Sequence, residues 1–399
     1  MTNRNKIMTF MLLFFLISGI VTVAFNPVSA SELIEDSWNT KTPMQHVRAG
    51  LGVIAVEGKI YALGGYGVDD VIVGTNERYD PKTDTWTTMT AMPTPRSQFT
   101  IATYQGKIYC IGGFNATIRG WGDIVIPCNV VEVYDTITDN WSAKTSYPFK
   151  GAGMCANVVD GQIFMVYGGD LFMYDIATDY WSQKTSMPGR SPSYINPVVI
   201  DNKIIFTDAI QFNGKTQKIM IYDTKTDVWS EGQGDSLGGI NGCAAVVTSG
   251  IRAPQKIYAL CLADLHVYDP VSNTWSTATS SPTTRRNFGM AIVDDVLYVI
   301  GGYISPDILS FYGSVEIVAT NEQYVPLGYR STAYTTPAPS NSGLSEPETL
   351  IRLPFLNPSM TVTALILTIG VVVVSSFVYL NKRKKRFTRN TTNLIHKAK

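Results

Sequence analysis

The stretch Tyr79-Asp80-Pro81-Lys82-Thr83-Asp84-Thr85-Trp86 is the most informative part of the sequence, because it recurs along the chain with a fixed internal spacing. The middle positions of its copies are rich in Asp, Pro, Thr and Asn, which suit a tight turn. Runs of Val, Ile and Tyr flank each copy and are typical of strands. Such a regular offset predicts a repeat architecture. In each of the five copies the Trp lies seven positions after the Tyr: Tyr79–Trp86, Tyr134–Trp141, Tyr174–Trp181, Tyr222–Trp229 and Tyr268–Trp275.

The rest of each unit extends outward from this turn as short antiparallel strands. In the first unit, the apolar runs 52–56 and 59–63 are joined by Glu57-Gly58, which suits a two-residue hairpin. A glycine pair ends the second strand, a third strand ends at the Tyr, and a fourth carries the Trp. The pairs are Gly64-Gly65, Gly112-Gly113, Gly168-Gly169 and Gly301-Gly302, while Thr207-Asp208 and Cys261-Leu262 stand in their place in units four and five.

Four short strands with a glycine pair and a late Trp resemble one blade of a kelch propeller. The resemblance covers residues 31–330, and about 50 residues per blade matches the kelch period. It implies an all-β, six-bladed β-propeller, and an ordinary β-sandwich with coincidental turns is the alternative. The sixth unit has no Trp strand after Tyr324, whereas Trp38 precedes the first hairpin. We therefore expect the N-terminal strand to complete the last blade, which would pair both exposed edges.

The first 30 residues are typical of a secretory signal peptide. Arg4 and Lys6 give a basic start, residues 8–25 are almost wholly apolar, and Val28-Ser29-Ala30 supplies small residues for cleavage. The apolar run is longer than a usual signal core, so an uncleaved signal anchor is the alternative.

The C-terminal region predicts a membrane anchor. Residues 331–358 are rich in Ser, Thr and Pro and predict an extended stalk. Residues 359–380 carry no charge and are long enough to span a hydrocarbon core of about 30 Å as a transmembrane helix. The tail 381–399 begins with a basic run, which stays in the cytoplasm. The predicted location is the cell membrane, with a single span and the propeller outside the cell.

Composition argues against several classes of function. The formal net charge is zero, only 16% of the residues are charged, and the repeat region has no basic stripe, so we expect no nucleic-acid partner. The three histidines are too few for a propeller copper site, and no Cys or His cluster has zinc spacing. We therefore expect no metal and no cofactor.

The expected binding face carries the loops between second and third strands and the connections between blades. Variable loops on a rigid scaffold are where binding usually occurs, and two of them present Trp121 and Tyr303. The resemblance implies a ligand site on this face, near the central channel. Alignment of the hairpins puts Arg48, Arg96 and Arg285 at one equivalent position. One hypothesis is an anion-accepting mouth, because Arg binds carboxylates bidentately. The other is that these arginines brace the blades.

Three functions follow from this face. The first is a cell-surface recognition or adhesion module that binds an extracellular protein or glycan. The second is a sugar-acid isomerase, because sialic acid mutarotases are also six-bladed kelch proteins. The third is a passive envelope scaffold. No motif for an acid/base carboxylate is found, and the repeated Glu77, Glu132 and Glu322 are interpreted as structural. The sequence therefore favours a non-catalytic function over an enzymatic one.

An exported chain permits disulfides and glycans. Cys243 and Cys261 align as cross-strand neighbours in the fifth hairpin, which predicts either a disulfide or two buried thiols. Cys110 and Cys128 flank the long second-unit loop and are a second candidate pair. Asn115 begins the sequon Asn115-Ala116-Thr117 in that loop and is the predicted glycan acceptor.

Overall fold

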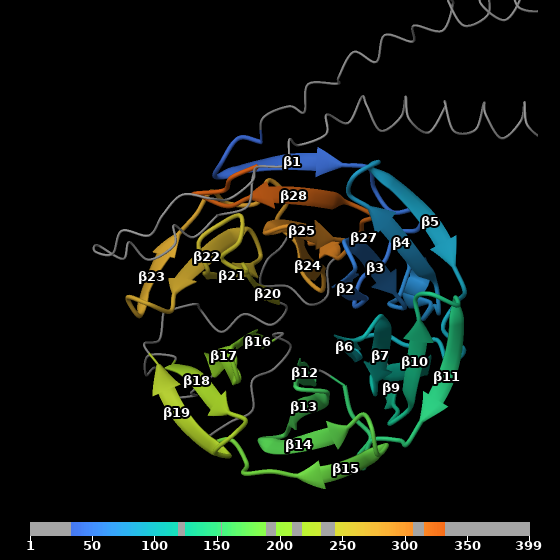
Figure 1. The fold of residues 1–399 in the computed structure, drawn as a ribbon. Coiled ribbons are helices and arrows are strands. Elements are labelled where there is room, and N and C mark those ends of the chain that lie inside the picture. The colour runs from blue at the N-terminus through green and yellow to red at the C-terminus, as the bar shows by residue number, and fades with distance from the viewer. Residues whose placement is uncertain are drawn as a thin grey trace, which may run out of the picture. The chain divides into compact units, whose positions relative to one another are not determined.

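The described residues form six four-stranded antiparallel sheets around a central axis (Figure 1). The computed structural model describes residues 33–118, 124–152, 154–188, 197–209, 218–232, 244–305 and 315–331. One compact unit runs from Met1 to Thr335, and a second, Thr336–Lys399, lies outside the described residues. The predicted all-β, six-bladed propeller is confirmed.

The blades follow one another along the chain, and each has its innermost strand first. Blade one contains β2 (Gly52–Val56), β3 (Lys59–Leu63), β4 (Asn76–Asp80) and β5 (Thr85–Met89); blade two contains β6 (Thr100–Tyr104), β7 (Lys107–Ile111), β10 (Val131–Asp135) and β11 (Asn140–Lys144); blade three contains β12 (Cys155–Val159), β13 (Gln162–Tyr167), β14 (Asp170–Asp175) and β15 (Tyr180–Gln183). Blade four contains β16 (Val198–Ile200), β17 (Lys203–Ala209), β18 (Lys218–Asp223) and β19 (Val228–Gly232); blade five contains β20 (Ala244–Val247), β21 (Ile257–Cys261), β22 (Asp264–Asp269) and β23 (Thr274–Thr277); blade six contains β24 (Gly289–Val293), β25 (Val296–Ile300), β28 (Asn321–Val325) and β1 (Ser37–Lys41).

The N-terminal strand closes the ring, as the position of Trp38 predicts. β1 pairs antiparallel with β28, and this register places Trp38 opposite Tyr324. The blue β1 lies beside the orange β28 at the outer edge of blade six (Figure 1). The first and last segments of the propeller therefore share one sheet, and neither is left as an unpaired edge.

The repeated turn joins neighbouring blades as well as neighbouring strands. In blade two, the Tyr134 hydroxyl donates to Asp139 Oδ1 at 2.6 Å, and this oxygen also accepts from the Thr90 amide at 2.9 Å. Trp141 Nε1 donates to the Thr90 carbonyl at 2.9 Å, so blade two holds both backbone groups of a residue at the end of blade one. Asp139 has a φ of 55°, a left-handed conformation that Asp and Asn tolerate well.

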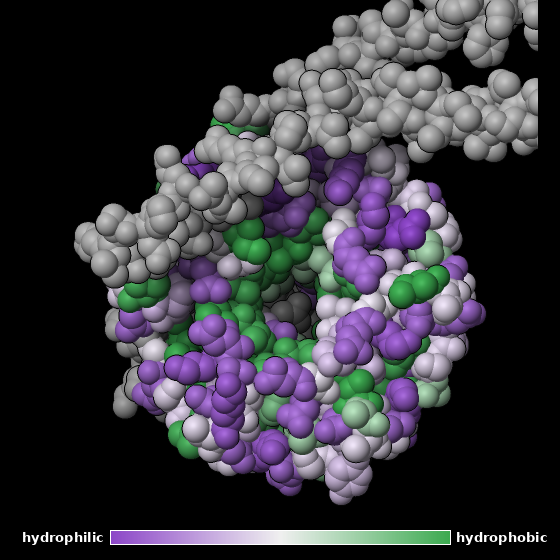
Figure 2. All heavy atoms as spheres, viewed as in Figure 1, coloured by the Kyte–Doolittle hydropathy of each residue, from purple (hydrophilic) through white to green (hydrophobic). Residues whose placement is uncertain are grey.

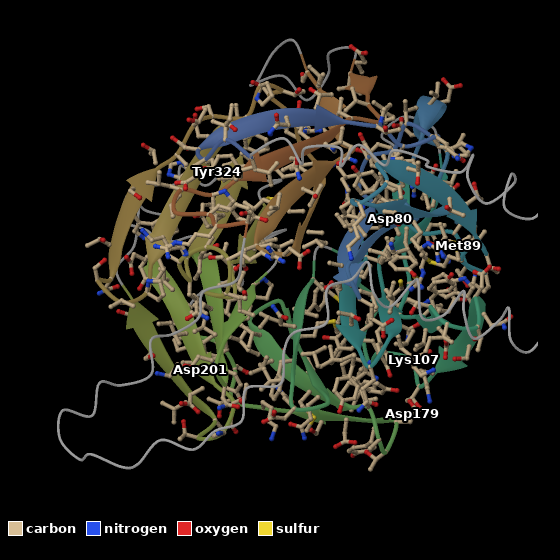
Figure 3. All side chains as sticks on the ribbon, turned by 45° about the horizontal axis from the view of Figure 1, so that its top comes forward. Asp80, Met89, Lys107, Asp179, Asp201 and Tyr324 are labelled. Atoms are coloured by element: carbon tan, nitrogen blue, oxygen red, sulfur yellow. The ribbon has the colours of Figure 1, made fainter. Side chains whose placement is uncertain are left out.

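This arrangement recurs around the ring. The bonded Tyr–Asp or Tyr–Asn pairs are Tyr79–Asp84, Tyr134–Asp139, Tyr174–Asp179, Tyr222–Asp227, Tyr268–Asn273 and Tyr324–Asp36, with Asp179 and Tyr324 labelled in Figure 3. The Thr residues held by the next blade are Thr42, Thr90, Thr145, Thr185 and Thr279. The Thr side chain joins the Thr amide in hydrogen bonding to the same carboxylate and in lowering its pKa, which gives a physical reason for Thr at this position.

The hydrophobic core lies between blades. The buried residues fall into six clusters, and each cluster draws on two adjacent blades. In one cluster, Ile111 and Val133 of blade two meet Ile163 and Met165 of blade three, and all four are nearly inaccessible to solvent. A blade thus buries its apolar faces only against its neighbours, and for this reason ring closure matters to stability.

Blades four and five depart from the repeat where the glycine pair is missing. In blade four, Thr207 and Asp208 continue strand β17 instead of leaving it. In blade five, Leu262 makes the turn after β21 with a φ of 60°. At Gly64 a side chain would meet the Arg96 carbonyl at 2.5 Å, so blade one needs glycine there.

The predicted terminal segments are not part of the described structure. The signal peptide at 1–30, the transmembrane segment at 359–380 and the tail at 381–399 all lie outside the described residues. Within the described ranges, no helix has the length and apolar character needed to cross a bilayer.

Candidate functional site

The connections between second and third strands are long in three consecutive blades. They span 12 residues in blade one (64–75), 19 in blade two (112–130) and 20 in blade six (301–320). Blades three and five use two residues each, 168–169 and 262–263. These connections all leave the same end of their blades. The long loops of blades six, one and two therefore lie on one face of the propeller, on one side of the ring. We call this surface the long-loop face.

Local structure shapes the three long loops. Blade two forms the hairpin β8 (Phe114–Ile118) and β9 (Ile124–Pro127), and blade six forms β26 (Tyr303–Ile304) and β27 (Glu316–Ile317). The blade-one loop contains one short 3₁₀ turn, η1 (Val68–Asp70). Each loop is tied to its base by an antiparallel bridge to the connection between blades. The bridges are Ala49–Tyr66, Ser97–Phe114 and Arg286–Tyr303.

The long-loop face exposes aliphatic side chains. Val68 is 65% exposed and Val71 57%, both in the blade-one loop. Val125 and Ile126 of β9 and Val315 beside β27 are also exposed. Single exposed apolar residues occur elsewhere, for example Ile137 and Val271 in the turns at the other end of the blades. The turns at that end carry one such residue on each of four blades, Ile137, Tyr180, Val228 and Val271. The long loops of blades one and two carry two each, and such gathering marks interaction sites.

The three predicted arginines lie inside the blades. Arg48, Arg96 and Arg285 are at most 1% exposed. Arg48 Nη2 lies 2.6 Å from Glu77 Oε2, and the same guanidinium donates to the carbonyl oxygens of Gly64, Thr75 and Ala62. The Arg48 side chain therefore joins the second and third strands of its own blade and the loop between them.

The other two arginines repeat this arrangement. Arg96 pairs with Glu132 at 3.0 Å and donates to the Gly112, Val130 and Cys110 carbonyls. Arg285 pairs with Glu322 and donates to the Gly301 carbonyl. Burial lowers the pKa of Arg285 to about 10, against the opposing effect of the Glu322 carboxylate. The geometry fits the bracing interpretation of these arginines and does not present them to a ligand at the mouth.

The buried ion pairs belong to the same three blades as the long loops. The buried Glu lies two positions before the repeated Tyr of the third strand. At that position blade three has Phe172 and blade four has Met220. Phe172 packs edge-on against Tyr147, with the ring centroids 5.5 Å apart. Blade three thus has an aromatic contact at the place of the carboxylate, and blade four has a buried Met side chain.

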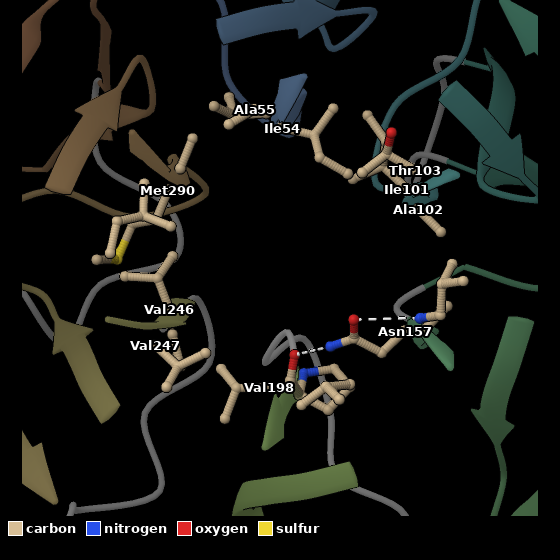
Figure 4. Close-up of a pocket in the computed structure, with 18 residues that line it drawn as sticks. Ile54, Ala55, Ile101, Ala102, Thr103, Asn157, Val198, Val246, Val247 and Met290 are labelled. Carbon is tan, nitrogen blue, oxygen red and sulfur yellow. Dashed lines mark hydrogen bonds between the residues drawn. The ribbon is translucent and has the colours of Figure 1, made fainter. Parts of the chain in front are cut away.

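A central channel passes between the innermost strands, and three residues of each blade line it. Each innermost strand contributes three consecutive residues or, in blade four, two residues and the preceding Pro197. The innermost strands are the edges of their sheets, so backbone N–H and C=O groups also face the channel. The lining residues are Val53, Ile101, Ala156, Pro197, Ala245 and Met290 at one level; Ile54, Ala102, Asn157, Val198, Val246 and Ala291 at the next; and Ala55, Thr103, Val158, Val199, Val247 and Ile292 at the third. The channel volume is about 390 Å³ (Figure 4). Hydrophobic residues surround the central opening in Figure 2.

The two polar side chains of the channel bond to the protein itself. Asn157 Nδ2 donates to the Pro197 carbonyl, and Asn157 Oδ1 accepts from the Val158 amide at 3.2 Å (Figure 4). Thr103 Oγ1 donates to the Lys107 carbonyl at 3.0 Å. Among the described residues that line the channel, none carries a carboxylate, an imidazole or an amine.

The remaining predicted site residues fall in different places. Trp121 and Cys243 lie outside the described residues, and Tyr303 is half-buried at the base of the blade-six loop. Asn115 is exposed in β8, where a glycan has room. Cys261 is in a disulfide. Across the described ranges, no cluster of three His, Cys, Asp or Glu could hold a metal.

The suggested tie between Cys110 and Cys128 is wrong. Both are free, buried thiols, and Cys128 Sγ instead lies 3.4 Å from the Gly112 carbonyl. The physical reason is that Cys110 is within β7, where its side chain is wholly buried in the interface between blades one and two. Burial raises the pKa of the Cys110 thiol to about 12.

The sequence analysis did not predict the central channel or the Thr residues that hydrogen-bond to the next blade. A Thr stands four positions after Trp38, Trp86, Trp141, Trp181 and Trp275, a repeat that was available as a signal. The channel had no comparable signal, because its lining residues are ordinary members of strands whose inward direction depends on how the blades are arranged.

Comparisons with known proteins agree with this architecture. The Kelch motif matches residues 48–93, 95–146 and 284–318, which lie in blades one, two and six. The same three blades hold the Arg–Glu pairs. The search of curated proteins finds no match. Among solved structures, one entitled "Structure of YjhT" is similar with a TM-score of 0.54 and 16% identity, covering 70% of this chain and 95% of that one. At this identity the likeness concerns the fold.

Proposed function

We propose that this protein is a cell-surface recognition module whose long-loop face binds a protein partner. The observation that carries the proposal is the group of exposed aliphatic side chains on the long loops of blades six, one and two. Propellers of the Kelch type commonly serve as interaction modules. A rigid ring with variable loops at one end suits this use, since the loops are positioned by the scaffold.

A protein partner fits these loops better than a sugar acid does. Val68, Val71, Val125 and Ile126 offer apolar area but no hydrogen bonds. Protein interfaces place such side chains at their centre, whereas a sugar acid requires polar groups or free guanidinium groups. The arginines that would serve an isomerase are engaged within the blades. No observation on the described residues favours catalysis.

The location is part of the proposal. The signal at 1–30 and the apolar segment at 359–380 support display of the propeller outside the cell on a Ser/Thr/Pro stalk. Asn115 would then carry a glycan at the edge of the binding face. Protease added to intact cells should remove the propeller and leave an epitope tag placed after Lys399 protected.

Site-specific photo-crosslinking on intact cells tests the binding face. A photoreactive residue at position 71 or 126 of the full-length protein should crosslink to one extracellular protein. The matched control places the same residue at position 137 or 271, in exposed turns at the other end of the blades, and should give no such product. The double substitution Val125→Asp with Ile126→Asp should remove the product at position 71.

The proposal fails if position 137 gives the same product, or if positions 71 and 126 give none in cells that display the protein. Loss of surface display is excluded separately by labelling intact cells with an antibody to the propeller.

A further inference from the structure

We propose that the channel mouth on the long-loop face binds an uncharged carboxamide side chain, Asn or Gln, presented by the protein partner. This site depends on the proposed function and adds to it the chemical group that the partner brings to the face. Three side chains form the site, Tyr66, Gln98 and Asn287, and we call them the mouth cluster. They come from blades one, two and six, the blades that carry the long loops.

The mouth cluster lies where the connections between blades meet the channel. Gln98 and Asn287 each stand two residues before an innermost strand, β6 or β24, and Gly50 has the same place before β2. These three strands border the central opening in Figure 1. The Gly50 amide donates to the Asn287 carbonyl at 2.8 Å, and the Gln98 amide donates to the Gly50 carbonyl at 2.8 Å. Backbone bonds thus join three blades into a rim beside the first level of channel residues.

Glycine at position 50 lets the side chains of the mouth cluster lie together. A Cβ there would be 3.0 Å from the Tyr66 ring and 3.2 Å from Gln98 Cγ, so both side chains lie directly against Gly50. Asn287 Nδ2 donates to the Tyr66 hydroxyl at 3.1 Å. An antiparallel bridge to Ala49 fixes the Tyr66 backbone at the base of the blade-one loop. The cluster is therefore held in place by its neighbours before any ligand binds.

The mouth cluster has hydrogen-bonding capacity that is not used within the protein. In the part of the chain that the structure describes, we find no acceptor for the Tyr66 hydroxyl hydrogen, and no partner for Asn287 Oδ1 or for the Gln98 side-chain amide. Burial raises the pKa of Tyr66 to about 12, so its hydroxyl keeps its proton at neutral pH and can donate. The cluster thus offers donors and acceptors without a formal charge.

The backbone at the rim indicates that the polar side chains have a role of their own. Gly50, Gln98 and Asn287 all have left-handed φ values, 61°, 50° and 52°. Glycine adopts this conformation freely and Asn tolerates it, whereas Gln is strained there. Position 50 shows that glycine fits the rim, yet position 98 carries Gln. Strain of this kind occurs preferentially at ligand sites.

A carboxamide matches the mouth cluster better than a charged or an apolar group does. It has two donors and an acceptor, which suit the Gln98 amide, the Tyr66 hydroxyl and Asn287 Oδ1. A carboxylate or an ammonium would lose water there without meeting an opposite charge in the cluster. The nearby Asp70 and Arg286 both have interactions of their own. An apolar group would leave the polar atoms of the cluster buried and unpaired.

A protein is the expected source of the carboxamide, because the mouth cluster adjoins the exposed aliphatic side chains of the long-loop face. Val68 lies two residues beyond Tyr66 in the same loop and is 65% exposed. A partner that covers this loop would also cover the mouth cluster. Interfaces of this kind combine apolar contacts with a small number of hydrogen bonds.

Crosslinking on intact cells, with the photoreactive residue at position 126 of the full-length protein, tests the site. Tyr66→Phe removes only the hydroxyl, and Gln98→Gly removes the amide and relieves the backbone strain. Each should lower the product per displayed molecule by about tenfold, because the partner loses a hydrogen bond. The purified Gln98→Gly protein should unfold at a temperature no lower than that of the native protein, which separates lost binding from lost stability.

A second Tyr–Gln pair at the other end of the propeller supplies the matched controls. Gln105 Nε2 donates to the Tyr104 hydroxyl at 3.2 Å, and Gln105 also has a left-handed φ, 47°. Tyr104→Phe and Gln105→Gly make the same chemical changes away from the long-loop face. Both should give the native amount of product at position 126.

A photoreactive residue at position 67, next to Tyr66, identifies the group that the partner presents. A side chain fits there, since its Cβ would meet only the Val47 carbonyl at 3.4 Å. The crosslinked segment of the partner should contain an Asn or Gln, and its change to Asp or Glu should remove the product at position 126.

The carboxamide site is ruled out if displayed Tyr66→Phe and Gln98→Gly chains give the native amount of product. It is also ruled out if the group crosslinked at position 67 is a glycan, or a segment without Asn or Gln. In these cases the native chain still gives its product at position 126, and the proposed function stands. Absence of any product from the native chain overturns the proposed function instead.

Discussion

The Tyr324 hydroxyl donates a hydrogen bond to Asp36 Oδ1 at 2.7 Å, although the two residues are 288 positions apart in the chain. In the other five blades the same bond joins residues five positions apart in one turn. Asp36 also accepts from the Thr279 amide of blade five at 3.0 Å. One carboxylate therefore connects the last strand of the propeller, its first strand and the neighbouring blade.

Asp36→Ala should destabilise the propeller by about 1–3 kcal/mol, because it leaves a buried Tyr hydroxyl without its acceptor. Asp84→Ala removes the same bonds from blade one, where the chain is continuous, and is the matched control. The two variants should lose similar stability in chemical unfolding. Only Asp36→Ala should speed proteolysis within residues 33–41, and equal proteolysis of both would contradict the role of Asp36 in closure.

Acid should weaken the inter-blade bonds. Burial raises the pKa of Asp139, but hydrogen bonds from Tyr134 and the Thr90 amide outweigh it, so the pKa lies below its usual value. Asp84 and Asp179 behave alike. A lowered folded-state pKa means that the stabilisation is complete above the unfolded value of about 4 and is lost as pH falls through the folded value.

The thermal midpoint of the propeller should accordingly fall below about pH 4. Asp139→Asn should reduce the slope of that fall, because Asn accepts the same bonds without titrating. Blade five already carries Asn273 at this position, so Asn273→Asp is the reverse control and should steepen the slope. Identical slopes in all three chains would rule out the carboxylates as the cause.

The buried Arg96–Glu132 pair makes a prediction about coupling. Arg96→Met alone leaves the Glu132 charge buried, and should cost about 3–5 kcal/mol. Replacing both with Met should cost clearly less than the sum of the single changes, because blade four already has Met220 at the Glu position. A double-mutant cycle in denaturant measures this coupling, and additive losses would show that the two side chains do not act as a pair.

The cysteines should differ in reactivity. Cys110 is buried with a pKa raised to about 12, so it should resist maleimide at pH 8 until the protein unfolds. Cys261 should react only after reduction, because it is in a disulfide. Peptide mass spectrometry before and after reduction separates these cases. Alkylation of Cys261 in the unreduced, unfolded chain would contradict the disulfide, with Cys128 as the internal standard for a free thiol.

Much of the candidate site was beyond sequence reasoning. Arg48, Arg96 and Arg285 could be aligned from the hairpins, but an Arg at a loop position can face a ligand or its own blade. The carbonyl groups of Gly64 and Thr75 and the carboxylate of Glu77 decide this for Arg48, and only folding brings them together. The predicted disulfide between Cys110 and Cys128 was wrong for the same reason, because the burial of Cys110 depends on the neighbouring blade.

The six-part repeat and the chemistry of its turn can be predicted from the sequence alone. They are local properties, because in five blades the Tyr, the Asp or Asn and the Trp lie within eight residues of one another. The borrowed first strand follows from counting, because the sixth unit lacks a Trp after Tyr324 while Trp38 precedes the first hairpin. The tertiary structure alone decided what lies at the centre and what faces out. Which side of each innermost strand lines the channel, and which loops stand on adjacent blades, depends on closing the ring, and no segment of the chain contains that information.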